Sequence, residues 1–198
     1  VLSSTLVATF RYTRDLFVHP VTRDVYAATT QGLMRSQNRG ESWARVVGIP
    51  ANLANSNIYD IQYAPAAGMI YISNANGVWR SPDGNPNTWQ NISTAATGFP
   101  QNLERVEMSL SASNPDVIYV IGEIDNGASN VFVTSNGGTN WTQRARPNNN
   151  NGNEFTNGQA WYDLVIAVDP VDSNRVWAGG IDIFRSDDGG LSWGLAGP

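Results

Sequence analysis

The sequence predicts an all-β fold in which one structural unit occurs four times, and three observations support that prediction. A short segment that ends in tryptophan recurs, with terminal tryptophans 46, 52 and 52 residues apart. A proline precedes the first residue of each segment by 16, 16, 19 and 16 positions. The chain also contains 19 Gly and 10 Pro among 198 residues, a composition typical of proteins with many tight turns. Two landmarks that keep the same phase four times indicate an internal repeat.

Each tryptophan-ended segment begins with serine or threonine and carries aspartate or asparagine at its third position. The four segments are SQNRGESW (36–43), SPDGNPNTW (81–89), TSNGGTNW (134–141) and SDDGGLSW (186–193). The upstream prolines are Pro20, Pro65, Pro115 and Pro170. Between each proline and its segment lies a run rich in valine, isoleucine and aromatic residues, which predicts a β-strand.

Each unit predicts four short strands. The innermost strands are expected at 14–18, 58–63, 106–111 and 162–168, the second at 24–29, 69–73, 117–122 and 175–179, and the third at 32–36, 77–81, 130–135 and 181–186. The outer strands open at the four tryptophans. Four short strands in every 46 to 52 residues, without helical periodicity, are typical of β-propeller blades. We therefore divide the single region 1–198 into repeats at about 11–50, 51–100, 101–146 and 158–198, and predict a loop in the polar stretch 146–159.

The recurrent segments resemble the BNR or Asp-box motif, S-x-D-x-G-x-x-W, and the resemblance covers nearly the whole chain. Proteins with this motif include sialidases, xyloglucan-degrading propeller hydrolases, sortilin-type receptors, photosystem II assembly factors and secreted Bacteroidetes-type repeat proteins. The resemblance implies that each segment is a hairpin between the third and fourth strands, on the rim away from the ligand-binding face. It also implies a propeller of six to ten blades, whose ring further blades or another chain would complete.

The chemistry of the motif residues suits a structural hairpin. The aspartate or asparagine accepts backbone N–H groups inside the turn, and glycine adopts the positive φ that a tight turn requires. The tryptophan buries a large ring, which contributes about 2–3 kcal/mol. The second box contains an extra residue, which displaces its glycine to Gly84. We assign this structural role to Ser36, Asn38, Gly40, Trp43, Ser81, Asp83, Trp89, Thr134, Asn136, Gly138, Trp141, Ser186, Asp188, Gly190 and Trp193.

Composition argues against several classes of function. The net charge of −5 disfavours nucleic-acid binding, because that function needs a basic surface that neutralises phosphates. No apolar window is long enough to span a membrane, so we expect no membrane insertion. The chain has no cysteine and one histidine, His19, which we expect in a solvated turn. We therefore predict neither a metal site nor a cofactor.

An acidic residue recurs at the predicted start of each innermost strand. These residues are Asp15, Asp60, Glu107 and Asp163. In a propeller the innermost strands surround the central channel, where repulsion among carboxylates would raise their pKa values. Two interpretations remain. In the one we favour, the carboxylates bind backbone amides of their own strand or of the neighbouring blade; in the other, they form a ring that binds a ligand or a cation. Among nearby aromatic residues, Trp79 is expected in the core, whereas Trp161 could belong to the core or stack on a sugar.

Three functions remain open. The main hypothesis is a non-catalytic bacterial module, secreted or on the cell surface, that binds a glycan or a protein. The alternative is a fragment of a propeller glycoside hydrolase, xyloglucanase-like rather than sialidase-like, because the sequence FRYT at 10–13 lacks the Ile-Pro of the sialidase arginine motif. The third is an assembly factor. Only five residues follow Trp193, so we expect the fourth blade to stop as its outer strand begins, or to pair with a strand at 6–10.

Overall fold

The computed structural model describes residues 10, 12–46, 56–101, 103–124, 128–148 and 152–197, which form four antiparallel sheets of four strands each. The first sheet contains β1 (Thr13–Val18), β2 (Val25–Thr29), β3 (Gly32–Ser36) and β4 (Ala44–Arg45). The second contains β5 (Ile58–Ala64), β6 (Met69–Asn74), β7 (Gly77–Ser81) and β8 (Gln90–Asn91). The third contains β9 (Val106–Leu110), β10 (Ile118–Ile124), β11 (Ala128–Thr134) and β12 (Thr142–Gln143). The fourth contains β13 (Val165–Val168), β14 (Val176–Gly179), β15 (Ile183–Ser186) and β16 (Gly194–Leu195). The described residues also include the short helices η3 (Ala95–Thr97) and α1 (Ala160–Asp163).

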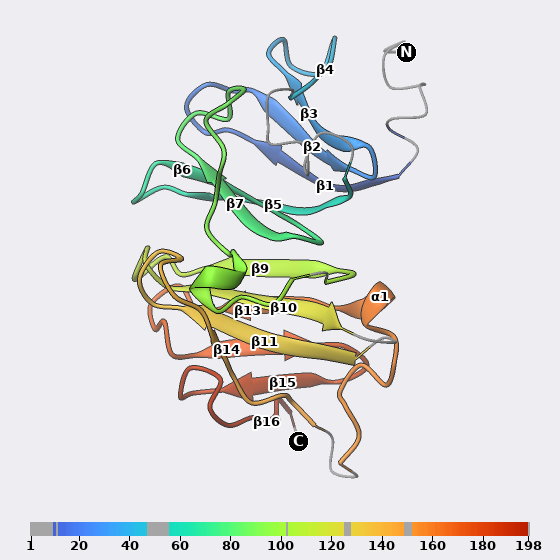
Figure 1. Ribbon diagram of the computed structural model, residues 1–198, viewed down its shortest axis with the longest axis vertical. Coiled ribbons are helices and arrows are strands. Elements are labelled where there is room, and N and C mark those ends of the chain that lie inside the picture. Colours follow the sequence, from blue (N-terminus) through green and yellow to red (C-terminus); the bar gives the residue numbers. More distant parts are fainter. Residues whose placement is uncertain are drawn as a thin grey trace.

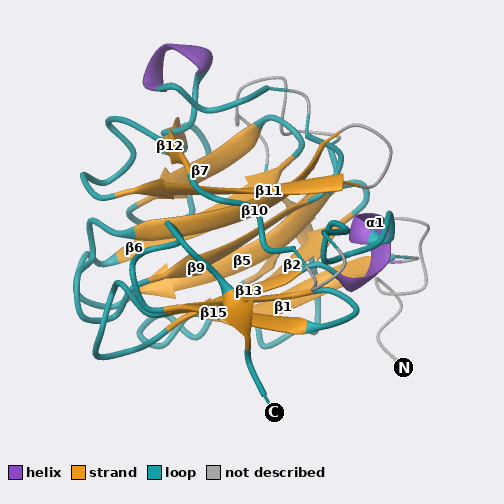
Figure 2. Cartoon of the chain, turned by 90° about the horizontal axis from the view of Figure 1, so that it is seen from below, coloured by secondary structure: helices purple, strands orange, loops and turns teal. Residues whose placement is uncertain are grey.

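The sheets are successive blades, which confirms the predicted all-β propeller architecture. In each sheet the strands follow the order of the sequence. The first strands β1, β5, β9 and β13 lie next to one another from blade to blade. The four sheets follow each other along the long axis in Figure 1, and they overlie one another when viewed from one end in Figure 2. The first strands therefore form the inner edge of the stack, and the Asp boxes lie toward its outer rim.

The hydrophobic core lies between the blades, because alternate residues of each strand face opposite neighbours. Leu33 of the first blade packs in one cluster with Ile70 and Trp79 of the second. Similar clusters join the second blade to the third and the third to the fourth. Trp79 is only 4% exposed and thus belongs to the core, as the sequence predicted.

The four Asp boxes form one recurrent hairpin between the third and fourth strands. In every box the hydroxyl of the first residue accepts a hydrogen bond from the glycine N–H, and the glycine has a positive φ. The distances are 2.8, 2.8, 2.9 and 2.8 Å for Ser36–Gly40, Ser81–Gly84, Thr134–Gly138 and Ser186–Gly190. The second box keeps this bond despite its extra residue, because the displaced glycine still reaches the serine.

Two box tryptophans also bind the preceding blade. The indole N–H of Trp141 donates to the carbonyl of Ile92 at 2.7 Å, and that of Trp193 donates to the carbonyl of Ala145 at 2.8 Å. Both carbonyls follow the outer strand of the preceding blade. In the third and fourth blades the box therefore both shapes its own hairpin and binds its blade to the one before.

Several expectations are wrong in detail. The fourth innermost strand, expected at 162–168, begins at Val165, because residues 160–163 form α1. The outer strand β16 has two residues, as do the other three outer strands, so the fourth blade contains the same four strands as its neighbours. His19 is 7% exposed rather than solvated, since its Nδ1 accepts hydrogen bonds from the N–H groups of Val21 and Thr22. Apart from Phe10, the strand suggested at 6–10 lies outside the described residues.

Candidate functional site

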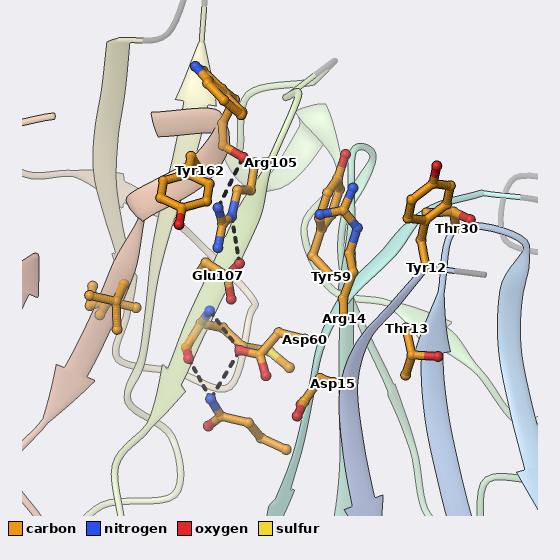
Figure 3. A pocket seen from close by; sticks show the side chains of 15 residues that line it. Tyr12, Thr13, Arg14, Asp15, Thr30, Tyr59, Asp60, Arg105, Glu107 and Tyr162 are labelled. Carbon is orange, nitrogen blue, oxygen red and sulfur yellow. Dashed lines mark hydrogen bonds and ion pairs between the residues drawn. The ribbon is translucent and has the colours of Figure 1, made fainter. Parts of the chain in front are cut away.

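A pocket of about 1190 Å³, here called the inner pocket, opens where the first strands of the blades meet. Side chains from β1, β5 and β9 converge there with residues of α1 and of β13, as Figure 3 shows. The lining residues are Tyr12, Thr13, Arg14, Asp15, Thr30, Tyr59, Asp60, Gln62, Arg105, Glu107, Met108, Trp161, Tyr162, Val165 and Ile166. Three of the four predicted ring carboxylates are among them.

Asp15 and Asp60 each bind the backbone of the next blade. Asp15 accepts a hydrogen bond from the N–H of Ile61 at 3.1 Å. Asp60 accepts one from the N–H of Met108 at 3.0 Å and a second from the Nε2 of Gln62 at 3.1 Å. Both carboxylates therefore make the neighbouring-blade contact of the structural interpretation while lining the inner pocket.

Burial changes the acidity of Asp60. The residue is 8% exposed, and loss of hydration is the largest cause that raises the pKa of its carboxyl to about 7. The negative charge of Glu107 raises this pKa further, while the hydrogen bond from Met108 opposes the change. Near neutral pH a large fraction of Asp60 is therefore protonated and can donate a hydrogen bond.

Glu107 has a different partner. Its Oε1 accepts a hydrogen bond from the Nε of Arg105 at 2.8 Å, and the two side chains are 20% and 18% exposed. Burial raises the pKa of Glu107, and the adjacent guanidinium opposes that change. The two neighbouring strands thus present unlike carboxyl groups: Asp60 accepts hydrogen bonds from Met108 and Gln62, whereas Glu107 is paired with an arginine.

The fourth predicted ring residue, Asp163, is not part of the inner pocket. It lies in α1, and its Oδ1 is buried without a hydrogen-bond partner among the described residues. Val165, the first residue of β13, pairs with Gly179 and occupies the position that Glu107, which pairs with Ile121, has in β9. The prediction that an acidic residue begins the innermost strand is therefore wrong for this blade. The α1 turn delays the start of the strand by three residues relative to the prediction.

Aromatic side chains flank the carboxyl groups. Trp161 and Tyr162 of α1 are 62% and 70% exposed, and their ring centroids lie 5.6 Å apart. Tyr12, which precedes β1, is 58% exposed. The guanidinium of Arg14 lies over the ring of Tyr59, 4.7 Å from its centroid. The exposure of Trp161 assigns it to the pocket rather than to the core.

Arg105 was not among the site residues predicted from the sequence. Residues two apart on a strand point to the same face, so the pattern Arg105-Val106-Glu107 contained a signal that an arginine accompanies the third ring carboxylate. The carbonyl groups that this arginine also binds belong to Trp161 of α1 and to Leu164, which follows it, and the sequence did not predict that helix.

Two further chemical features are absent from the described part of the chain. It contains no group of three or more histidine or acidic residues arranged to hold a metal ion. Nor does it include a helix with the length and apolar character needed to cross a bilayer.

Known proteins resemble this chain in sequence and in fold. No family model matches it. A xyloglucanase of Paenibacillus sp. is 26% identical over 177 residues, which cover 85% of this chain and 15% of that enzyme. A GH74 enzyme of Niastella koreensis aligns with a TM-score of 0.63 at 22% identity, over 91% of this chain and 28% of its own. An ancestral GH74 enzyme aligns with a TM-score of 0.69 at 23% identity, over 94% of this chain and 24% of its own.

The chain thus spans 15% to 28% of the length of these three proteins. The solved structures share the bladed fold, and the xyloglucanase shares sequence along most of the chain. Together with the recurrent hairpins and the inner edge of first strands, these similarities establish the fold. The chain consists of four Asp-box β-propeller blades, similar to a part of the GH74 xyloglucanases.

Proposed function

We propose that the chain is part of a propeller glycoside hydrolase that acts on xyloglucan or a related glucan, and that its inner pocket binds the glycan. The sequence and fold similarities support an enzyme over the non-catalytic module that was the main hypothesis. The observation that carries the proposal is the exposed pair Trp161 and Tyr162, which stands beside Asp60 and Glu107 in one pocket.

The chemistry of the pocket suits a sugar chain. Sugar rings present apolar C–H faces that pack on aromatic rings, while their hydroxyl groups exchange hydrogen bonds with carboxyl groups. Trp161 and Tyr162 provide the aromatic faces, and Glu107 provides an acceptor. Asp60, whose carboxyl group is partly protonated near neutral pH, provides a donor in its protonated form. Tyr12 extends the aromatic surface to the end of the pocket formed by β1.

We also propose that the fourth blade packs against a further blade. In β11 of the third blade, Val131, Phe132 and Val133 are all buried, because that sheet lies between two neighbours. In β15 of the fourth blade, Phe184 is buried but Ile183 is 58% exposed. An additional Asp-box sheet would cover this apolar face. Because a polymeric glucan such as xyloglucan is too large to diffuse across a cell membrane, we place the protein outside a bacterial cell, which detection in the culture supernatant would test.

The proposal is tested with xyloglucan oligosaccharides on the 198-residue chain. Calorimetry measures binding, and reducing-sugar release measures turnover. Trp161→Ala should weaken binding roughly tenfold or more, because it removes a large stacking surface. Leu191→Ala is the matched control, since Leu191 is also 62% exposed but lies outside the inner pocket. Absence of binding would contradict the proposal, and turnover by this chain would exclude the non-catalytic module.

A further inference from the structure

Arg105 connects the third and fourth blades beneath the exposed aromatic pair. Its Nη1 donates a hydrogen bond to the carbonyl of Trp161 at 3.1 Å, and its Nη2 donates one to the carbonyl of Leu164 at 3.3 Å. Its Nε is held by Glu107. One guanidinium therefore binds a pocket carboxylate on one side and the backbone that carries the aromatic pair on the other, as the dashed lines in Figure 3 show for two of these bonds.

The helical turn α1 has few other attachments. It is four residues long, has no side-chain cap at its first end, and buries one of its own residues, Ala160. An isolated turn of this length is unstable, because the cost of nucleating a helix is not recovered over so few residues. Carbonyl groups at the end of a helix also need partners from outside the helix. Arg105 provides such partners at Trp161 and Leu164.

Arginine suits this role for a geometric reason. Its guanidinium carries five donors in a fixed planar arrangement, so it can bind a carboxylate and two carbonyls at once. Lysine has a single ammonium group that serves these acceptors less well. The ion pair with Glu107 is only partly exposed, so solvent competes weakly for the guanidinium.

We propose that Arg105 is a positioning residue, which fixes α1 so that Trp161 and Tyr162 stand over the carboxyl groups of the inner pocket. Its consequence for glycan binding rests on the function proposed above, whereas the ordering of α1 does not. Arg105 acts through the aromatic pair and not through direct contact with sugar.

The ordering is tested without ligand. The chain contains seven tryptophans, and 5-fluorotryptophan labelling gives each a ¹⁹F signal, with that of Trp161 assigned by Trp161→Phe. Arg105→Met should shift and broaden the Trp161 signal, while Arg105→Lys should restore it in part. Arg80→Met is the matched control, because Arg80 also donates to a carbonyl of the next blade, that of Gly137 at 3.2 Å, but lies away from the inner pocket. An unchanged Trp161 signal in Arg105→Met would overturn the proposal.

A second variant separates position from charge. Glu107→Gln keeps an oxygen that can accept the Nε–H of Arg105 but removes the negative charge. The Trp161 signal should therefore stay near its original position in Glu107→Gln. A Trp161 signal in this variant as broad as in Arg105→Met would also overturn the proposal, because it would mean that charge near α1, and not the hydrogen bonds to its carbonyls, orders the turn.

The consequence is tested with a thermodynamic cycle on xyloglucan oligosaccharide binding. Arg105→Met alone should weaken binding about tenfold, but it should have a much smaller effect once Trp161→Ala is present, since residues that act through one group are not additive. Full additivity would assign Arg105 a direct sugar contact and overturn the positioning role. If the wild-type chain binds no glycan while Arg105→Met still disturbs the Trp161 signal, the proposed function fails and the ordering of α1 stands.

Discussion

The four blades repeat the same contacts at their rim, but their residues differ at the inner edge. At the rim, all four Asp boxes make the same bond from the glycine N–H to the first hydroxyl, although two boxes carry asparagine and one carries an extra residue. At the inner edge, the equivalent position holds a carboxylate in three blades and Val165 in the fourth. Even the carboxylates differ, because Asp60 binds the next blade and Glu107 binds Arg105.

This difference separates the positions that stabilise the fold from those whose residues can vary with function. A contact that tolerates substitutions without changing its geometry serves the fold, and the rim hairpins are of that kind. A position whose chemistry changes from blade to blade cannot be required by every blade. The inner pocket lies at such positions, and the delayed start of β13 creates the turn that carries its aromatic pair.

The largest expected effect compares two tryptophans, one from each region. Trp141→Ala should reduce the free energy of unfolding by about 3–5 kcal/mol, because it leaves a cavity in the interface between the second and third blades. Trp161→Ala should change it by less than about 0.5 kcal/mol, since the side chain is 62% exposed. Urea titration of both variants measures the contrast. Equal losses of free energy of unfolding would show that Trp161 at the inner edge stabilises the fold as much as Trp141 at the rim.

The next effect tests the buried carboxyl group of the inner edge. Burial raises the pKa of Asp60 from its ordinary value to about 7, so the folded state holds the proton more tightly than the unfolded state. The stability that this group contributes is full below pH 3.8 and is lost as the pH rises toward 7. Each pKa unit corresponds to about 1.4 kcal/mol, which makes the whole loss on the order of a few kcal/mol.

Asp60→Asn removes this titration while keeping an oxygen that can accept the N–H of Met108. The variant should match the wild type near pH 4 and be the more stable protein at pH 8. Urea titrations at both pH values measure the difference in free energy of unfolding. A constant difference across that range would show that Asp60 titrates normally in the folded state.

The sequence predicted the rim far better than the inner edge. Each box combines residues whose local chemistry fixes a turn, so its geometry follows from a few neighbouring positions such as Ser186, Asp188 and Gly190. Asp163 matched the inner-edge pattern by sequence spacing alone. Its true position depends on the loop before it, where Phe155 is buried at 2% exposure in the core between the third and fourth blades and α1 follows. That placement arises from tertiary packing, which no local pattern contains.

A smaller effect compares two box glycines with nearly the same φ, +89° at Gly40 and +91° at Gly138. A Cβ at position 40 would have its nearest neighbour at 3.8 Å, so Gly40→Ala should cost only the backbone strain of about 1–2 kcal/mol. A Cβ at position 138 would lie 2.6 Å from the Cβ of Ile92, so Gly138→Ala should cost about 1–3 kcal/mol more. Thermal unfolding of the two variants measures this difference. Equal melting temperatures would mean that the contact between the box and the preceding blade relaxes freely.

The smallest effect compares aspartate and asparagine within the boxes themselves. Hydrogen bonds from the hydroxyl and the N–H of Ser192 lower the pKa of Asp188 to about 2, so the stability it contributes is present above its unfolded pKa of 3.8 and is lost as the pH falls toward 2. In the first box, Asn38 makes the corresponding bonds, with its Nδ2 donating to the hydroxyl of Ser42 at 2.9 Å. Asp188→Asn therefore needs only a rotation of the Ser192 hydroxyl, which donates to Asp188 at 2.6 Å in the wild type. The variant should be slightly less stable at pH 6, and that difference should vanish by pH 2, as measured by chemical denaturation at both values. A difference that persists at pH 2 would show that the carboxylate stabilises its hairpin through geometry that an amide cannot reproduce, and that the interchange of the two residues between boxes is not neutral.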